Sequence, residues 1–197
     1  MATITSIIGL QNLINLGSFA ADFNSLESLN LSNLSQLSYV DVSDNNFPGT
    51  STNSLSSVNL TGCPYVDVLR LDDSDFSMGV PDISELIVLT NLDYDQCNIS
   101  GNIDISYSNS LQFVDLSGNT NLTSVTITDA QPILTLFLSS CALTEQAVDD
   151  VLVTLSNNGQ SNGVVNLDGG TNAIPSATGL AAKLVLEGNS WIVNVNS

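Results

Sequence analysis

The sequence predicts an α/β solenoid, a right-handed coil of chain that stacks short parallel strands into one sheet along a concave face. Three observations predict this class. The pattern L-x-x-L-x-L-x-x-N/C-x-L recurs seven times between residues 37 and 143. Copies starting at Val66, Leu89, Leu111 and Ile133 are 22 or 23 residues apart, which suits one turn of such a coil. With 43% hydrophobic and 11% charged residues, the 197-residue chain also has enough apolar surface to fold.

Each copy of the pattern predicts one short strand. In L-x-L the two apolar side chains point to one face of the strand, and the residues between and after them point to the other. Strands that stack in parallel about 4.8 Å apart would align these side chains in a continuous core. The Asn or Cys position then lies at an inward turn, where an unpaired buried amide costs roughly 1–3 kcal/mol. This position is occupied by Asn45, Cys63, Cys97, Asn119 and Cys141.

Other copies fall between the turns of this 22-residue series. They start at Leu55 and Leu122, and a weaker one contains Ile103 and Ile105. We expect these copies to form the return half of a coil, as a second short strand or extended segment on an otherwise irregular convex side. A looser copy starts at Leu26.

The chain is expected to form a single domain over residues 1–197, with three parts. Residues 1–36 would form N-terminal coils or a cap, residues 37–143 the regular repeats, and residues 144–197 C-terminal coils that contain helices.

The C-terminal part combines helix and strand signals. Thr144 is a suitable N-cap for a helix within Leu143–Gly159, and a second helix is expected over Ser176–Asn189. Strands are expected at 164–167 and 191–195. Trp191 is expected to anchor a cap over the open end of the solenoid rather than to form a ligand platform.

Charge and histidine content exclude several classes of function. Two cationic residues against twenty carboxylates give a net charge of −18, which would repel nucleic acid and anionic lipid. The absence of histidine removes the usual neutral-pH general base and every Ser-His-Asp, Cys-His or His-metal site. No apolar run approaches the roughly 20 residues needed to cross a bilayer, and the first residues lack the charged start of a secretory signal. We therefore expect no nucleic-acid partner and no membrane insertion.

The three cysteines, Cys63, Cys97 and Cys141, all fall at the turn position of the pattern. We expect three reduced thiols in a buried row, because the sequence has no C-x-x-C motif, no histidine and an odd number of cysteines. Metal binding or catalysis by a cysteine is the alternative.

These repeats resemble the leucine-rich-repeat family, over roughly residues 13–143 by motif and nearly the whole chain by architecture. Residues 157–196 resemble the C-terminal coils of repeat proteins encoded by tailed bacteriophages and some bacteria. That second resemblance implies a structural or attachment role on a virion or a bacterial surface.

Solenoids bind partners with the sheet face, so the outward residues of L-x-L-x are the candidate site. The first outward column is predicted to hold Asp41, Arg70, Asp93, Asp115, Phe137 and Asn166. The second is predicted to hold Ser43, Asp72, Asp95, Ser117, Ser139 and Asp168. The candidate binding residues are Asp41, Arg70, Asp72, Asp93, Asp95, Asp115, Phe113 and Phe137.

Like charges on neighbouring strands are destabilising unless something compensates them, as for Asp93 beside Asp115 or Asp72 beside Asp95. Three interpretations remain open. The face is simply solvated, it binds a basic or polar protein, or its carboxylates hold Ca²⁺ or a sugar. A Ca²⁺ ion would lie at Asp93, Asp95 and Asp115, and a sugar would also contact aromatic residues such as Tyr39 and Phe113.

The sequence favours a non-enzymatic structural or binding protein. The first hypothesis is a bacteriophage virion component, on the tail or capsid surface, that uses the solenoid face to assemble with other virion proteins or to attach to a host surface protein or glycan. A bacterial surface or secreted interaction protein is the alternative. A carbohydrate-active enzyme with paired carboxylates is a lesser alternative, because nothing in the sequence indicates an acid with a raised pKa.

Overall fold

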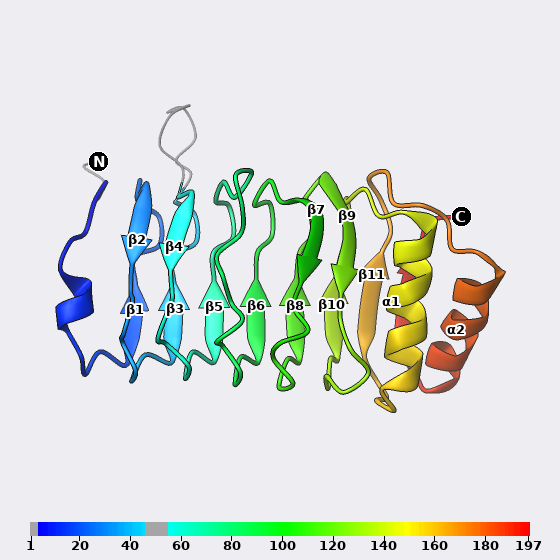
Figure 1. Ribbon diagram of the computed structural model, residues 1–197. Coiled ribbons are helices and arrows are strands. Elements are labelled where there is room, and N and C mark those ends of the chain that lie inside the picture. The colour runs from blue at the N-terminus through cyan, green and yellow to red at the C-terminus, as the bar shows by residue number, and fades with distance from the viewer. Residues whose placement is uncertain (1–3, 46–54) are drawn as a thin grey trace.

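The computed structural model describes residues 4–45 and 55–197, and Figure 1 shows them as one elongated stack of coils. The last two residues of the first pattern copy, Asn46 and Phe47, lie outside the described residues. A short 3-10 helix, Leu10–Asn12, precedes the first strand. The strands are β1 (Ser18–Ala20), β2 (Ser28–Asn30), β3 (Tyr39–Asp41), β4 (Ser57–Asn59), β5 (Val68–Arg70), β6 (Asn91–Asp93), β7 (Ser100–Asp104), β8 (Phe113–Asp115), β9 (Asn121–Thr126), β10 (Thr135–Phe137), β11 (Val164–Leu167) and β12 (Ile192–Val195). The helices are α1 (Glu145–Asn157) and α2 (Ala177–Gly188).

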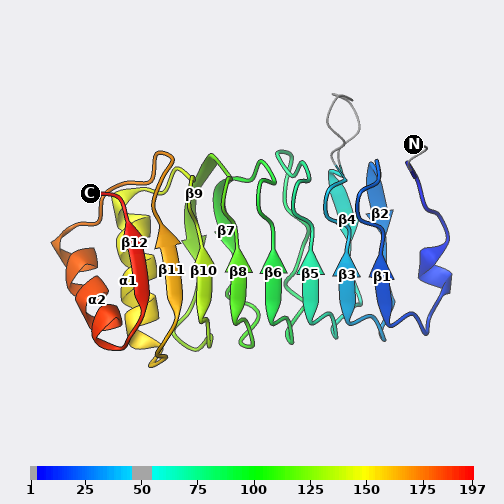
Figure 2. The same cartoon turned by 180° about the vertical axis from the view of Figure 1, so that it is seen from behind.

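Eight of the described strands form one parallel sheet, called here the main sheet, in the order β1-β3-β5-β6-β8-β10-β11-β12. The strands that the main sheet skips pair on the opposite side of the coils, β2 with β4 and β7 with β9, also in parallel (Figure 2). A mostly parallel α/β architecture with a solenoid-like course is thus confirmed. The copies at Leu26, Leu55 and Leu122 and the one containing Ile103 supply the four return strands.

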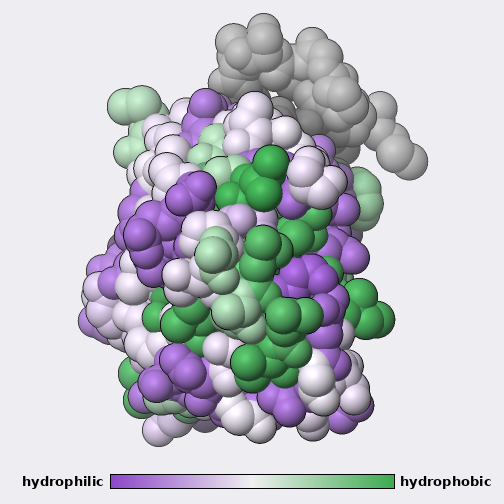
Figure 3. All heavy atoms as spheres, turned by 90° about the vertical axis from the view of Figure 1, so that its right-hand side faces the viewer, coloured by the Kyte–Doolittle hydropathy of each residue, from purple (hydrophilic) through white to green (hydrophobic). Residues whose placement is uncertain are grey.

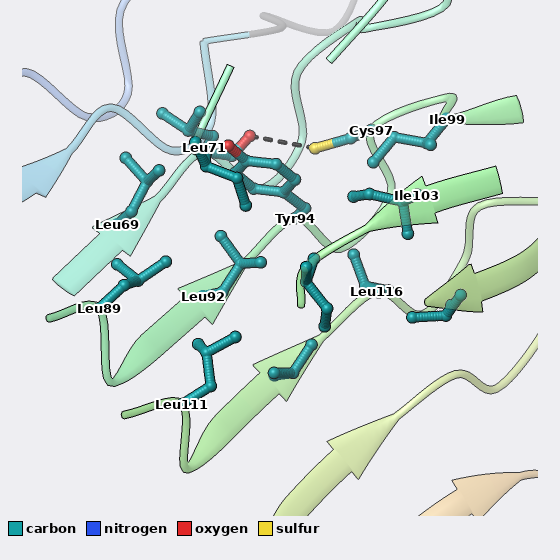
Figure 4. Close-up of a cluster of buried hydrophobic side chains, with 14 of the residues drawn as sticks. Leu69, Leu71, Leu89, Leu92, Tyr94, Cys97, Ile99, Ile103, Leu111 and Leu116 are labelled. Atoms are coloured by element: carbon teal, nitrogen blue, oxygen red, sulfur yellow. Dashed lines mark hydrogen bonds between the residues drawn. The ribbon is translucent and has the colours of Figure 1, made fainter. Parts of the chain in front are cut away.

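Aliphatic side chains fill the interior because every second residue of a strand points inward. Each main-sheet strand has only three or four residues, so it contributes one or two inward side chains. The middle residues of adjacent strands, such as Leu69, Leu92 and Val114, are directly paired and fully buried. Figure 4 shows the Leu69 and Leu92 side chains pointing into the space between the two halves of the coil, where Ile103 from a return strand also lies. The core is therefore one continuous column of apolar side chains running along the stack.

The turn position holds adjacent coils together by hydrogen bonds. Asn119 is fully buried, and its side-chain amide donates to the carbonyl of Tyr94 in the preceding coil and to that of Leu116 in its own. Its side-chain carbonyl accepts from the backbone N–H groups of Cys97 and Ile99. Four buried backbone groups thus find partners on one side chain, which is why an amide is favoured here.

The same arrangement recurs with other residues. Asn45 donates to Ala21 and Val42 and accepts from Leu26. Cys97 and Cys141 occupy equivalent turns, and each thiol lies within hydrogen-bonding distance of a carbonyl of the preceding coil. All three cysteines are free and buried, as the sequence analysis expects.

Both predicted C-terminal helices are present and lie on the side of the coils opposite the main sheet (Figures 1 and 2). The Thr144 hydroxyl accepts from the N–H of Ala147, and the Ser176 hydroxyl accepts from that of Thr178, so each helix begins at a capping side chain. Trp191 is only 4% exposed, and its indole N–H donates to the carbonyl of Gln160. Within the described residues, neither helix is long and apolar enough to span a membrane.

Candidate functional site

The outward face of the main sheet carries the first predicted column in the predicted register. Asp41 is paired with Arg70, Arg70 with Asp93, and Asp93 with Asp115. Asp115 is then paired with Phe137, and Phe137 with Asn166. Stacking of successive coils, which are 22 to 29 residues long here, places these side chains next to one another although they are far apart in the sequence.

Arg70 is the centre of an ion-pair cluster on this face. Its guanidinium lies 3.5 Å from Asp41, 3.6 Å from Asp93 and 3.9 Å from Asp72. The Asp41 and Asp93 side chains flank Arg70 from the two neighbouring strands, so one cation partly compensates carboxylates from three coils. The repeat pattern predicts the place of Arg70 in the column but not its ion pairs with its acidic neighbours.

Asp41 is the best-satisfied carboxylate of the cluster. It accepts hydrogen bonds from the Tyr39 hydroxyl at 2.9 Å and from the Ser43 hydroxyl at 2.7 Å. Burial acts to raise the pKa of Asp41, but these hydrogen bonds and the charge of Arg70 outweigh it and lower the pKa. Asp41 therefore stays charged at neutral pH and fixes one side of Arg70.

Asp72 and Asp93 differ from Asp41. Burial raises the pKa of Asp72 to about 7, and the charge of Asp93 adds to this against the opposing charge of Arg70. Burial also raises the pKa of Asp93 to about 6, helped by the charge of Asp115. The 3.9 Å contact with Arg70 is too long for a hydrogen bond, and the Asp72 Oδ1 atom has no hydrogen-bond partner. Two carboxyl groups that titrate near neutral pH thus lie beside a single cation.

A hollow lies next to this cluster. Its volume is about 290 Å³, and it is lined by Val68, Arg70, Asn91, Asp93 and Phe113. Three of the lining residues, Val68, Asn91 and Phe113, are directly aligned on adjacent strands and point outward one column before Arg70 and Asp93. Val68 and Asn91 are not among the candidate residues predicted from the sequence, although their positions in the strand pattern place them in the same outward row as Tyr39 and Phe113.

The far side of the hollow is aromatic. The rings of Phe113 and Phe137 meet edge to face with centroids 6.0 Å apart, and both side chains are partly exposed. Asp115, which is paired directly with Phe137, accepts hydrogen bonds from the backbone N–H and the hydroxyl of Ser117. The site is thus charged around Arg70 and apolar toward β10.

Asp95 is the remaining candidate, and it lies beyond the end of β6. It accepts a hydrogen bond from the Gln96 side chain, and burial is the main cause that raises its pKa. Among the residues that the structure describes, no group of three or more histidine, cysteine or acidic side chains is arranged to hold a metal ion. The Ca²⁺ hypothesis for Asp93, Asp95 and Asp115 therefore has no supporting geometry in this part of the chain.

The three thiols are expected to be poor nucleophiles. Burial raises the pKa of Cys63, Cys97 and Cys141, so each is held as the neutral thiol rather than as the nucleophilic thiolate. Each thiol lies within hydrogen-bonding distance of a backbone carbonyl at a turn, and none lies on the outward face of the main sheet.

Comparisons of the chain with protein-family models, with curated proteins and with solved structures found no match. The arguments about function therefore rest on the residues and the geometry described above.

Proposed function

We propose that this chain is a non-enzymatic binding protein of the leucine-rich-repeat type, and that it presents the outward face of the main sheet to a basic segment of a protein partner. The 22-residue spacing and the turn ladder of Asn and Cys side chains support the repeat assignment. One observation carries the binding proposal. Asp93 and Asp115 are paired on adjacent strands beside an open hollow, and among the residues that the structure describes Arg70 is the only cation near them.

A cationic side chain of a partner fits this place on three counts. It would lie beside two neighbouring carboxylates whose mutual repulsion it removes. It would meet the ring of Phe113, whose face attracts a cation. Its aliphatic stem would contact Val68, which lines the same hollow.

The experiment uses an Arg-rich decapeptide as the probe and compares two double variants of equal charge. Asp93→Asn with Asp115→Asn removes the proposed contact, whereas Glu27→Gln with Asp129→Asn removes two exposed acids elsewhere. We expect the first variant to weaken binding about tenfold or more by calorimetry, and the second to change it much less. Equal losses would mean that the peptide responds only to net charge, and the proposal would fail.

We further propose a bacteriophage virion as the location, on the tail or capsid surface, where the partner is another virion protein or a host surface protein or glycan. The support is the resemblance of residues 157–196 to C-terminal coils of such proteins. Mass spectrometry of purified particles and of the culture supernatant separates this from a bacterial surface or secreted protein. Absence of the chain from the particles would reject the proposed virion location.

The raised pKa values of Asp72 and Asp93 favour one second candidate, a carbohydrate-active enzyme, because acid–base hydrolysis needs a carboxyl group protonated near neutral pH. Incubation with host polysaccharide would then release new reducing ends, and Asp93→Asn would abolish the release. No release with the parent protein would exclude this candidate for that polysaccharide.

A further inference from the structure

The C-terminal end of the stack leaves an apolar helix face uncovered. Gly179 faces α1 so closely that a Cβ atom there would lie 2.1 Å from Asp149 Oδ1. The side of α2 turned away from α1 carries Leu184 and Val185, which are 70% and 51% exposed, beside Leu180. Figure 3 looks onto this end and shows apolar side chains gathered across its centre. The C-terminal coil therefore buries Trp191 but presents an apolar helix face to solvent.

Both ends of the main sheet are strand edges. In the described residues β12 pairs only with β11, and β1 pairs only with β3. All strands of this sheet run in the same direction, so the free edge of β12 has the polarity needed to pair with a free edge such as that of β1. An open edge presents unpaired backbone groups that accept another strand.

The N-terminal end also exposes apolar side chains, in the segment that precedes β1. Ile8, Leu13 and Ile14 are 91%, 52% and 64% exposed. Leu13 and Ile14 also line an open hollow of about 410 Å³ together with Asn12, Asn15 and Leu16. Exposed apolar side chains thus lie beside the free strand edge at both ends of the coil, as expected of interaction surfaces.

The distribution of charge separates the ends from the middle. Residues 1–21 contain no charged side chain, and residues 169–197 contain only Lys183 and Glu187, which form an ion pair with each other. The other nineteen carboxylates and Arg70 all lie within residues 22–168. Copies that approach side by side would bring these acidic segments together, whereas copies that approach end to end would meet through surfaces whose side chains carry no net charge.

We propose that copies of this chain stack end to end, with β12 of one copy beside β1 of the next and the exposed face of α2 against the apolar N-terminal segment. This arrangement continues the main sheet in its own direction. A two-fold contact between two C-terminal ends would make an antiparallel pair and leave Ile8, Leu13 and Ile14 uncovered. The proposed head-to-tail contact, in contrast, leaves one free end on each side of the assembly, so it produces chains of varying length. The inference is independent of the ligand proposed for the sheet face.

The test is the solution mass of the purified chain over a range of concentrations, measured by analytical ultracentrifugation. We expect species larger than the monomer that grow with concentration and with added NaCl, because salt screens the acidic middle segments. Leu184→Asp blocks the C-terminal surface and Ile14→Asp blocks the N-terminal surface. Each should raise the dissociation constant about 30-fold or more, the size typical of an interface hot spot.

Mixing the two variants gives the decisive readout. Leu184→Asp retains a normal N-terminal surface and Ile14→Asp retains a normal C-terminal surface, so their mixture should form a dimer and grow no further. Ile87→Asp is the matched control, since Ile87 is 60% exposed but lies between the two ends, and it should assemble like the parent. Circular dichroism melting of each variant verifies that it folds. A second pair of single variants, Val185→Asp at the C-terminal surface and Leu13→Asp at the N-terminal surface, repeats the mixing test.

Three results would overturn the proposal. The parent chain could remain monomeric at every concentration and salt level. Loss of assembly in Leu184→Asp but not in Ile14→Asp would indicate a two-fold contact between C-terminal ends. An effect of Ile87→Asp equal to that of the end variants would show that assembly does not depend on the ends.

Discussion

At the scale of single residues, stability depends on side chains that are fully enclosed between coils. Leu116 and Leu138 are both completely buried, and each belongs to the inward column that follows the middle residues of the strands. Removal of such a side chain leaves a cavity that the stacked coils cannot collapse around, because each coil is fixed by hydrogen bonds to its neighbours on both sides.

We therefore expect Leu116→Ala or Leu138→Ala to lower the free energy of unfolding by about 2–5 kcal/mol. The measurement is the midpoint of urea denaturation at constant slope. Leu184→Ala, at a position 70% exposed, serves as the control and should change the midpoint little. An unchanged midpoint for both buried variants would show that the assigned inward column is wrong.

The carboxyl groups around Arg70 make stability depend on pH. Asp72 and Asp93 titrate at about 7 and 6 in the folded chain, against an ordinary value of 3.8. Between about pH 4 and these raised pKa values, the folded state holds more protons than the unfolded state. The resulting contribution to the free energy of unfolding is therefore complete below about pH 4, and it is lost as the pH rises through 6 and 7. The lowered pKa of Asp41 acts in the opposite sense, but only as the pH falls below the ordinary value.

The melting temperature is thus expected to be higher at pH 5 than at pH 8. Asp72→Asn should raise the value at pH 8 and reduce the difference between the two pH values, because it removes a desolvated charge next to Asp93. Asp129→Asn removes an exposed carboxylate and accounts for the general effect of net charge. If the two variants have the same pH profile, burial of Asp72 does not control the dependence.

At the scale of elements, the sequence predicts the strands well and the turns less well. The L-x-L alternation determines which residues point inward, and equivalent positions in successive copies become outward neighbours even where a coil is 29 residues long, as between Asp41 and Arg70. The Asp41–Arg70–Asp93–Asp115 register therefore follows from the pattern. The pattern cannot predict a turn of another length. Asn172 performs the role of Asn119 for the coil that contains β11, but it follows its inward residue, Leu167, by five positions instead of three.

The shifted pKa values could not be predicted in the same way. Whether a carboxyl group is solvated depends on the side chains that surround it from two or three coils, and the repeat fixes only the backbone positions. Ser74 illustrates the limit further. It stands at the turn position of its coil, but the hydroxyl is buried without a hydrogen-bond partner, so the pattern predicts the place and not the bonding.

The turn ladder itself is testable as an element that joins coils. Asn119→Ala would leave the N–H groups of Cys97 and Ile99 and the carbonyls of Tyr94 and Leu116 without this partner. Because each unsatisfied buried group costs about 1–3 kcal/mol, we expect a loss at least as large as that for Leu116→Ala. Asn121→Ala, two positions after Asn119 but exposed, is the control for urea denaturation.

At the scale of the whole molecule, nineteen of the twenty carboxylates lie in the middle segment with a single cation. Their mutual repulsion opposes the compact state at low ionic strength, and any salt that screens it should stabilise the fold. The same repulsion would keep the middle segments of different copies apart, so it favours the proposed contacts through the ends, whose side chains carry no net charge. Stability and assembly are therefore expected to increase together as salt is added.

Calcium distinguishes this general screening from a specific ion site. No metal-binding group of side chains is present in the described residues, so millimolar Ca²⁺ should raise the melting temperature only as far as NaCl of matched ionic strength does. A specific site would add a stabilisation that grows with the logarithm of Ca²⁺ concentration and that Asp93→Asn with Asp115→Asn removes. Such an excess would support a Ca²⁺ site on the outward face of the main sheet. The basic partner proposed for Asp93 and Asp115 would then compete with a metal ion for the same carboxylates.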